Sequence, residues 1–412
     1  MNNLHFRSYL FLFLITLCCT FLSSCAKKET STAEKPSAQK GYTGDNYKIG
    51  VILPLTGKYA PYGEATLHGV ECSAGIFSPC DSPTKVELII RDDAGLPDRA
   101  ALAVEDLAKN ENVSVIVGPL SSSSIDTAAQ KAQELGVPLI SLSQKEGITS
   151  VGDNIFSTAL TAALQVNEVV NWAVNKKKLK KFAVVYPMNA FGETYKKLFT
   201  EAVKSAGGKI VLSTGYGEAT YDFANLLEGK KEKFDALFIP DSYRAVGFVA
   251  SSLSSEDLDG TQLLGINRWN NPELVERGGD YLQGAVFVDG FFENGDSAAT
   301  QNFTSAFEQA YGIKPTVLEA QSFDAERLAA KALQSTGGEH PLDVKTALAT
   351  LPEVEGSTGP VSFDSNREAI KHLFLLSVKG DKIVEISDGS PRSTPKGKYG
   401  EPISSPGQDT KY

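Results

Sequence analysis

The chain has 412 residues, a formal net charge of −10 and a hydrophobic fraction of 42%. A chain of this length can bury the cores of two domains or of one large bilobed unit. The acidic balance excludes a general nucleic-acid-binding surface, because such a surface needs Lys and Arg gathered on one face.

The N-terminal segment has the pattern of a secretory leader. One Arg precedes an apolar run over residues 9–22, which is short for a bilayer span but suits the hydrophobic region of a signal peptide. The run ends in Leu-Ser-Ser-Cys, which resembles a bacterial lipobox. We therefore expect residues 1–24 to be a lipoprotein signal peptide and Cys25 to be lipidated, with an ordinary signal peptide as the alternative.

The segment after Cys25 is expected to tether the protein to the membrane through the lipid. Residues 25–46 are rich in Lys, Ser, Thr and Gly and lack periodicity, which is typical of a flexible linker. Ala26 follows the lipidated Cys where an Asp commonly retains Gram-negative lipoproteins at the inner membrane. By that resemblance, we expect the protein to lie in the periplasm, with its lipid anchor in the outer membrane.

Gly50 and the later Gly57-Lys58 pair invite comparison with a phosphate-binding loop. Six residues separate the two glycines where that loop has four, and Tyr59 stands where Ser or Thr is needed. Residues 51–53 are β-formers, so Gly50 is expected within a strand. The pattern predicts a strand followed by a polar loop, and no nucleotide site.

Two cysteines remain once the leader and Cys25 are set aside. Cys72 falls late in a predicted helix and Cys80 follows Pro79. An oxidising compartment favours a disulfide between them, with two unpaired thiols as the alternative. Their spacing does not suggest a metal site.

From Tyr47 onward, short apolar runs of β type alternate with amphipathic helical patterns. The strand-like runs are 48–53, 86–91, 113–117, 138–142, 182–186, 210–213, 236–239, 262–265 and 285–288, with two final strands at 372–378 and 382–387. This alternation predicts an α/β fold with parallel sheets wound by helices through right-handed crossovers. Residues 388–412 are rich in Pro, Gly, Ser and Lys and are expected to be a disordered tail.

Ligands of doubly wound sheets bind beyond the carboxyl ends of the strands. The loops at those ends are polar and aromatic here, and solvent exposure alone is the alternative explanation. They are residues 54–63, 92–95, 118–124, 141–147, 187–192, 240–244 and 267–271.

Several segments together resemble the type I periplasmic binding proteins of the leucine/isoleucine/valine-binding kind, the substrate-binding lipoproteins of ABC transporters. They include "IGVILPLTGKYAPYGEATLHGVE", "VSVIVGPLSSSS", "GVPLISLSQ", "KFAVVYPMNAFGETY" and "DALFIPDS". The resemblance implies two Rossmann-like lobes with parallel sheets, joined by three crossings that act as a hinge near Thr158, Asp289 and Phe363. Lobe 1 is then 47–157 with 289–362, and lobe 2 is 158–288 with 363–387.

The same resemblance implies a site for a small amino-acid-like or acidic ligand. The positions that match the carboxylate-binding residues of the family are Ser122, Ser143 and Lys145. Ser121 and Ser122 also open a predicted helix, whose free N–H groups favour an anion, although Ser is a common helix cap as well. Lys145 departs from the small hydroxyl residue of the family, and a surface lysine is its alternative reading.

The remaining matched positions are aromatic or polar. Tyr62 and Phe191 match aromatic residues of the two lobes and are expected to cover an apolar part of the ligand. Asn267 stands where the amino-acid binders carry an acid for the ligand's ammonium. Asp241 could substitute for that acid, or could cap the following helix.

A narrower resemblance points to a different class of function. "LISLSQKEGIT" and "LLGINRWNNPELV" resemble penicillin-binding-protein activators, outer-membrane lipoproteins that stimulate a peptidoglycan synthase. The expected partners are thus a small ligand with an ABC permease, or a cell-wall synthase. No cofactor, metal site or catalytic residue is expected, since the four His show no metal spacing and each Ser-X-X-Lys lies in the tether, a loop or the tail.

Overall fold

The computed structural model describes residues 47–217, 223, 226–227, 233–253, 258–338 and 340–386. The expected signal peptide, Cys25, the tether 25–46 and the tail 388–412 lie outside these ranges. Across the described ranges, no helix is both long enough and apolar enough to span a bilayer.

The first sheet is parallel throughout, with the strand order β2-β1-β3-β4-β5. Its strands are β1 Tyr47–Leu53, β2 Val86–Asp92, β3 Ile116–Val117, β4 Leu139–Ser141 and β5 Ile155–Ser157. Its helices are α2 Ala60–Ser73, α3 Pro97–Lys109, α4 Ile125–Leu135, α11 Val317–Thr336 and α12 Pro341–Thr350.

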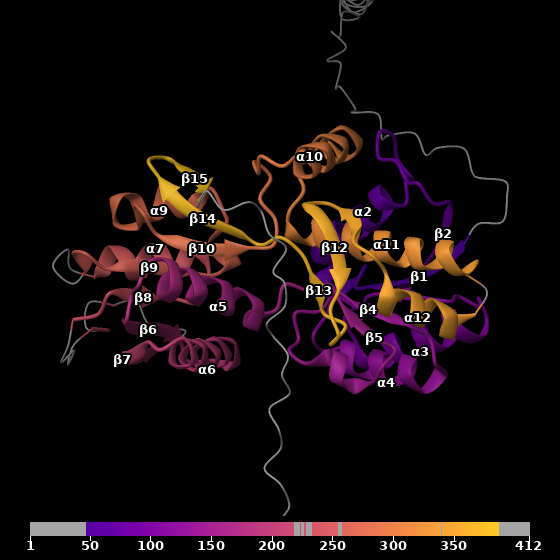
Figure 1. Ribbon diagram of the computed structural model, residues 1–412, viewed down its shortest axis with the longest axis horizontal. Coiled ribbons are helices and arrows are strands. Elements are labelled where there is room, and N and C mark those ends of the chain that lie inside the picture. The colour runs from indigo at the N-terminus through magenta and orange to yellow at the C-terminus, as the bar shows by residue number, and fades with distance from the viewer. Residues whose placement is uncertain are drawn as a thin grey trace, which may run out of the picture. The chain divides into compact units, whose positions relative to one another are not determined.

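Strand β1 shows why both faces of this sheet are covered (Figure 1). Its side chains alternate between the faces, as the period of two requires. Val51 and Leu53 pack in one core with residues of α2, α11 and α12, whereas Ile52 packs in another with residues of α3 and α4. A parallel sheet buried on both sides is typical of doubly wound folds.

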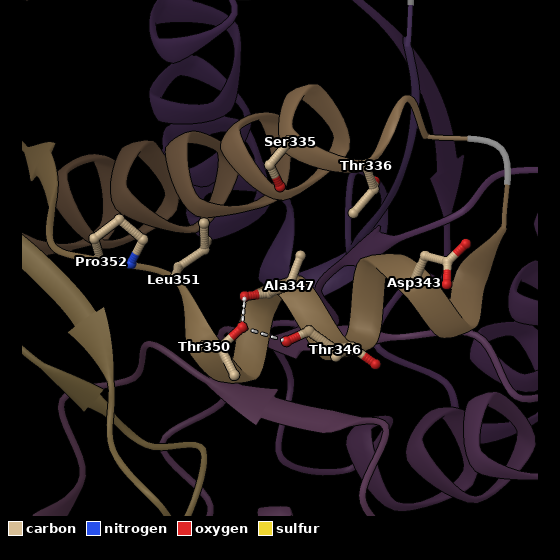
Figure 2. A pocket seen from close by; sticks show the side chains of 8 residues that line it. All are labelled: Ser335, Thr336, Asp343, Thr346, Ala347, Thr350, Leu351 and Pro352. Atoms are coloured by element: carbon tan, nitrogen blue, oxygen red, sulfur yellow. Dashed lines mark hydrogen bonds between the residues drawn. The ribbon is translucent and has the colours of Figure 1, made fainter.

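An open groove of about 520 Å³ lies between α12 and the end of α11 (Figure 2). It is lined by Ser335, Thr336, Asp343, Thr346, Ala347, Thr350, Leu351 and Pro352. The hydroxyls of Thr346 and Thr350 donate to carbonyls of their own helix, each at 2.9 Å. Because its hydroxyls are already engaged, this groove has few donors to offer a ligand.

The second sheet is mixed, with the strand order β15-β14-β10-β9-β8-β6-β7. Its strands are β6 Lys181–Pro187, β7 Lys209–Tyr216, β8 Ala236–Phe238, β9 Gln262–Gly265, β10 Val286–Asp289, β14 Phe374–Lys379 and β15 Lys382–Glu385. Strand β14 is antiparallel to β10, and β15 follows it through a hairpin turn at Gly380 and Asp381, which makes the last pair antiparallel as well.

Several helices among the described residues accompany the second sheet, and a large aromatic core joins them to it. The helices are α5 Ala162–Val170, α6 Ala190–Ser205, α7 Tyr243–Ser252 and α9 Glu273–Gly278, and a π-helical turn, Asn171–Lys176, extends α5. In the core, the rings of Phe199 and Phe238 stack at 4.1 Å, and Trp269 is fully buried.

The chain passes between the two sheets three times. The first passage, between β5 and α5, contains Thr158, and the second follows Asp289 at the end of β10. After the second passage, α10 (Ala298–Tyr311) packs with Phe323 of α11.

The third passage lies later than the expected Phe363. An antiparallel sheet of β11 Val354–Gly356, β12 Gly359–Phe363 and β13 Ala369–Ile370 packs in the core of the first sheet. The ring of Phe363 lies 5.0 Å from that of Phe156. The chain therefore leaves the first sheet only between Ile370 and Phe374.

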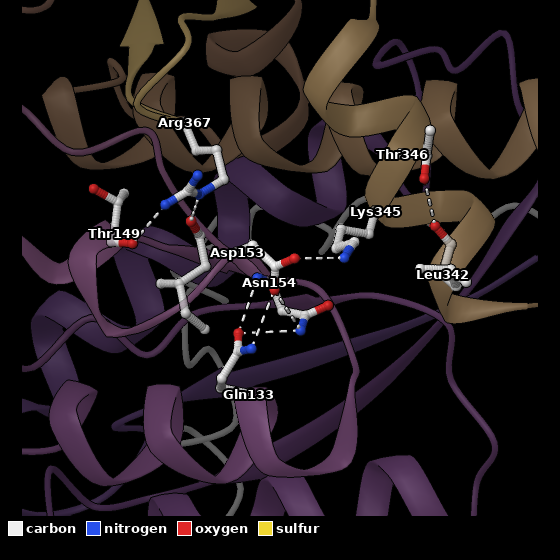
Figure 3. A network of polar contacts seen from close by, with 9 residues as sticks. Gln133, Thr149, Asp153, Asn154, Leu342, Lys345, Thr346 and Arg367 are labelled. Carbon is white, nitrogen blue, oxygen red and sulfur yellow. Dashed lines mark hydrogen bonds and ion pairs between the residues drawn. The ribbon is translucent and has the colours of Figure 1, made fainter.

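Polar contacts hold this segment to the first sheet as well (Figure 3). The Arg367 guanidinium donates to the carbonyls of Thr149 and Ile155, at 2.8 and 3.0 Å. Lys345 of α12 pairs with Asp153 at 2.7 Å in the same region. These bonds explain why residues beyond Phe363 stay with the first sheet.

A buried lysine links the three passages. Lys371 lies in the third passage, is 4% exposed, and donates from Nζ to the Thr158 carbonyl at 2.9 Å. Burial lowers its pKa, and the opposing charges of Asp324 and Asp289 act in the other direction. Burial raises the pKa of Asp289 to about 7, although Asn270 donates to its carboxylate at 2.8 Å.

Helix α2 is fixed at its end by a disulfide. The sulfurs of Cys72 and Cys80 are bonded, with the Cα atoms 5.1 Å apart. Both residues are buried in a cluster with Phe303 and Phe307 of α10. The expected disulfide is thus present and joins the end of α2 to the loop before β2.

Candidate functional site

The carboxyl end of β2 organises the first candidate loop. The Asp92 carboxylate accepts from the backbone N–H of Leu55 at 2.8 Å and from the hydroxyl of Thr56 at 2.6 Å. Burial acts to raise the pKa of Asp92, but the hydrogen bonds that it accepts outweigh burial and lower that pKa. This carboxylate therefore positions the loop that leads to Tyr62, whose side chain is 57% exposed.

The serines expected to bind ligand lie around the start of α4. Ser143 is fully buried and its Oγ lies 3.4 Å from that of Ser122, which is exposed. The hydroxyls of Ser121 and Ser123 are 2.7 Å apart, and Ser123 also donates to the Gly95 carbonyl at 2.8 Å. The structure thus brings Ser122 and Ser143 together, as the sequence predicts.

Lys145 does not stand free beside these serines. Its ammonium pairs with the carboxylate of Asp126, in the first turn of α4. A second carboxylate, that of Asp93, is fully buried nearby and accepts from the Gly95 N–H at 2.9 Å. Burial raises the pKa of Asp93. The first site is therefore rich in hydroxyl and amide groups, and its cation is already paired.

The second sheet carries an aromatic site joined by one buried amide. Phe191 lies in the first turn of α6, with its ring 4.8 Å from that of Tyr195. Gln165 of α5 donates to the Tyr195 hydroxyl and accepts from the Asn267 N–H, each at 2.9 Å. Gln165 thus connects α5, α6 and the turn after β9 by hydrogen bonds. These bonds fix the position of Asn267 relative to α6, which carries Phe191.

Asp241 is engaged by its own neighbours. Its carboxylate accepts from the Tyr216 hydroxyl at 2.5 Å and from the Ser242 N–H at 2.6 Å. The cap of α7 is Ser242, whose hydroxyl accepts from the Ala245 N–H. The alternative reading of Asp241 as the helix cap is therefore wrong.

Arg268 is a residue that the sequence reading missed. It lies in the 3-10 turn Asn267–Trp269 after β9, and its guanidinium is 4.4 Å from the centre of the Phe191 ring. Arg268 is exposed and forms no ion pair with a described carboxylate. Its loop was among the candidates, but no local pattern shows that Phe191, far away in the sequence, lies under the guanidinium.

A metal site would need several metal-binding side chains close together. Within the described ranges, no group of three or more His, Cys, Asp or Glu residues could hold a metal ion. The arrangement is instead suited to a small polar molecule, because hydroxyls, backbone amides, aromatic rings and the Arg268 guanidinium lie in the described loops beyond the strands.

The chain is similar to proteins that bind small solutes. A family model described as periplasmic binding protein matches residues 46–382. The Leu/Ile/Val-binding protein BraC3 of Rhizobium johnstonii is 24% identical over 80% of this chain and 90% of its own. The leucine-, isoleucine-, valine-, threonine- and alanine-binding protein of Pseudomonas aeruginosa is 25% identical over 79% and 88%.

Solved structures show the same fold. A putative branched-chain amino acid ABC transporter from Rhodospirillum rubrum matches with a TM-score of 0.75 at 21% identity, over 83% of this chain and all of that one. A solute binding protein of an ABC transporter from Rhodopseudomonas palustris, in complex with 3,4-dihydroxy benzoic acid, matches with a TM-score of 0.66 at 26% identity, over 85% and 99%. These matches confirm the predicted fold class.

Proposed function

Since the chain belongs to the periplasmic binding protein family, we propose that it binds a small carboxylate-bearing solute and presents it to an ABC transporter. The observation that carries the proposal is the chemistry beyond the strands of each sheet. Ser122 and Ser143 meet beyond the first, and Phe191 and Arg268 meet beyond the second. Relatives named for branched-chain amino acids, and a structure holding an aromatic acid, support this class of ligand.

The three passages give the proposal its mechanism. A solute that contacts the loops of both sheets stabilises the arrangement in which both contacts are made, and the passages around Thr158, Asp289 and Lys371 would absorb the movement. Tyr62 and Phe191 would cover the apolar part of the solute. The protein thus binds and releases its ligand and performs no chemistry on it.

The location proposed for this activity is the cell envelope. The leader and Cys25 would place the mature protein outside the cytoplasm on a lipid anchor, with the outer membrane favoured. Docking on a peptidoglycan synthase rests on the narrower resemblance alone. A measurement of solute binding distinguishes transport from docking, because only a transport protein must bind a solute.

Thermal denaturation with a panel of solutes tests the proposal. We expect at least one of leucine, isoleucine, valine, glutamate, benzoate and 4-hydroxybenzoate to raise the melting temperature. A solute at 100 times its dissociation constant stabilises the native state by about 2.7 kcal/mol. The methyl ester of the same solute is the control and should have a smaller effect. An unchanged melting temperature with the entire panel would contradict the proposal and favour docking.

A further inference from the structure

Several charged groups beyond the first sheet are already engaged by neighbouring groups. The Lys145 ammonium is bound to Asp126. The Asp92 carboxylate accepts from backbone N–H groups and from the Thr56 hydroxyl, and Asp93 is buried. An incoming anion would therefore meet hydroxyls and amides around Ser122 and Ser143. Lys58, which has no ion pair with a described carboxylate, lies with Nζ 4.6 Å from the centre of the Tyr59 ring.

Two arginines beyond the second sheet have no ion pair with a described carboxylate, and one of them, Arg244, donates from Nε to the Tyr243 hydroxyl at 3.0 Å. Lys196 of α6 pairs with Glu193 at 2.6 Å, and Arg277 of α9 pairs with Glu273 at the same distance. Arg268 has no such partner among the described carboxylates. The charges of Glu146 and Arg268 act on the pKa of Tyr195 in opposite directions, and the Glu146 carboxylate accepts from the Ala163 N–H at 2.9 Å.

The stacking on Phe191 prepares Arg268 to receive a planar anion. An aromatic ring whose centre lies 4.4 Å from the guanidinium carbon restricts the movement of the Arg268 side chain. A carboxylate can accept two parallel hydrogen bonds from the N–H groups of one guanidinium. Phe191 is fixed in turn through α6, whose first turn is capped by Asn189.

An α-ammonium beside that carboxylate would share its nearest acid with groups that already donate to it. Asp241 already accepts from Tyr216 and Ser242, and Asn267 has no charge. An ammonium next to a carboxylate on Arg268 would also lie close to the guanidinium and be repelled by it.

We propose that Arg268 receives the anionic group of the solute, so that this chain selects organic acids without an α-ammonium, such as hydroxylated aryl carboxylates. Ser122 and Ser143 then bind the neutral polar end of the solute, which is the opposite orientation to the one that the sequence predicts. The inference rests on the proposed function and names the ligand class of its site.

Titration calorimetry with 4-hydroxybenzoate and its neutral isostere 4-hydroxybenzamide tests the inference. We expect the parent protein to prefer the acid. Arg268→Gln should weaken binding of the acid by at least about tenfold, the effect of losing a hydrogen bond to a charged group, and leave the amide unchanged. Arg277→Gln removes the same charge from the same half of the protein and should bind both probes as the parent does.

The possible results separate this inference from the function on which it rests. Equal loss of acid and amide in Arg268→Gln, or a loss of the preference for the acid in Ser122→Ala instead, would overturn the assignment of Arg268. Binding of leucine with no binding of the aryl acid would overturn the inference and keep the proposed function. Failure of every panel solute to bind would overturn both.

Discussion

Glu326 shows how one buried side chain couples stability to pH. It is fully buried in α11 and accepts a hydrogen bond from the hydroxyl of Ser73 in α2. Burial raises its pKa to about 7, against a usual value of 4.5. Between these two values the native state holds a proton that the unfolded chain has released, so the free energy of unfolding falls as the pH rises.

Glu326→Gln removes this titration. We expect the free energy of unfolding of the variant to fall less steeply than that of the parent between pH 5 and pH 7, by about 1.4 kcal/mol per pH unit. Urea denaturation at several pH values measures the difference. Parallel curves for the two proteins would show that the Glu326 carboxyl does not titrate in this range. Glu71 and Asp289, whose pKa values burial raises to about 7, keep their own contributions in both proteins.

The candidate binding residues show the limit of prediction at this scale. The resemblance to the family predicts Ser122 and Ser143, and each lies in a loop just beyond a strand. The pairing of Lys145 with Asp126 and the stacking of Arg268 on Phe191 depend on distances between loops of different strands. Periodicity and propensity carry no information about those distances, so the sequence yields candidate loops but not the contacts between them.

Helices α2 and α11 cross at a glycine. A Cβ atom added to Gly69 would lie 2.2 Å from the Glu319 carbonyl oxygen and from the Ser322 hydroxyl. Ser322 also donates to the Thr66 carbonyl at 2.8 Å across the crossing. The close approach of the two backbones therefore requires the absence of a side chain at this position.

Gly69→Ala should separate the two helices despite the better helix propensity of Ala. We expect a loss of about 1–3 kcal/mol in the free energy of unfolding, which is typical of overpacking a core. Chemical denaturation measures the loss. Glu64→Ala, an exposed change in the same helix, is the control and should have little effect. If Gly69→Ala were neutral or stabilising, the crossing would be looser than the structure indicates.

The elements themselves were largely predictable, because buried strands read as short apolar runs and helices as amphipathic ones. Strand β2 was expected at 86–91 and spans Val86–Asp92. The third passage was predicted too early, near Phe363. The strands β12 and β13 in this segment are short, and the contacts that hold them to the first sheet come from Phe363 and Arg367. Nothing in the local pattern of these strands assigns them to one sheet or the other.

At the scale of the whole molecule, the three passages share one polar centre. Lys371, in the third passage, donates to the Thr158 carbonyl of the first and lies in the field of Asp289 at the start of the second, as well as that of Asp324 in α11. Removing one member of a buried charged group leaves the others uncompensated, which costs more than the pair contributes.

Lys371→Met should destabilise the protein by about 3–5 kcal/mol, because Asp289 and Asp324 would lose their buried countercharge. Lys345→Met removes a lysine whose partner, Asp153, is largely exposed, and should cost about 1 kcal/mol or less. Guanidinium denaturation compares the two variants. Equal stability of both would mean that the passages are held by packing alone.

The late synthesis of β14, the antiparallel neighbour of β10, affects folding during translation. Strand β10 ends at Asp289, but its neighbour begins only at Phe374. A nascent chain that emerges N-terminus first therefore carries an unpaired strand edge while α10, α11 and α12 are synthesised. Such an edge pairs readily with other chains. Chaperone protection should accordingly be needed until the last described hairpin has been added.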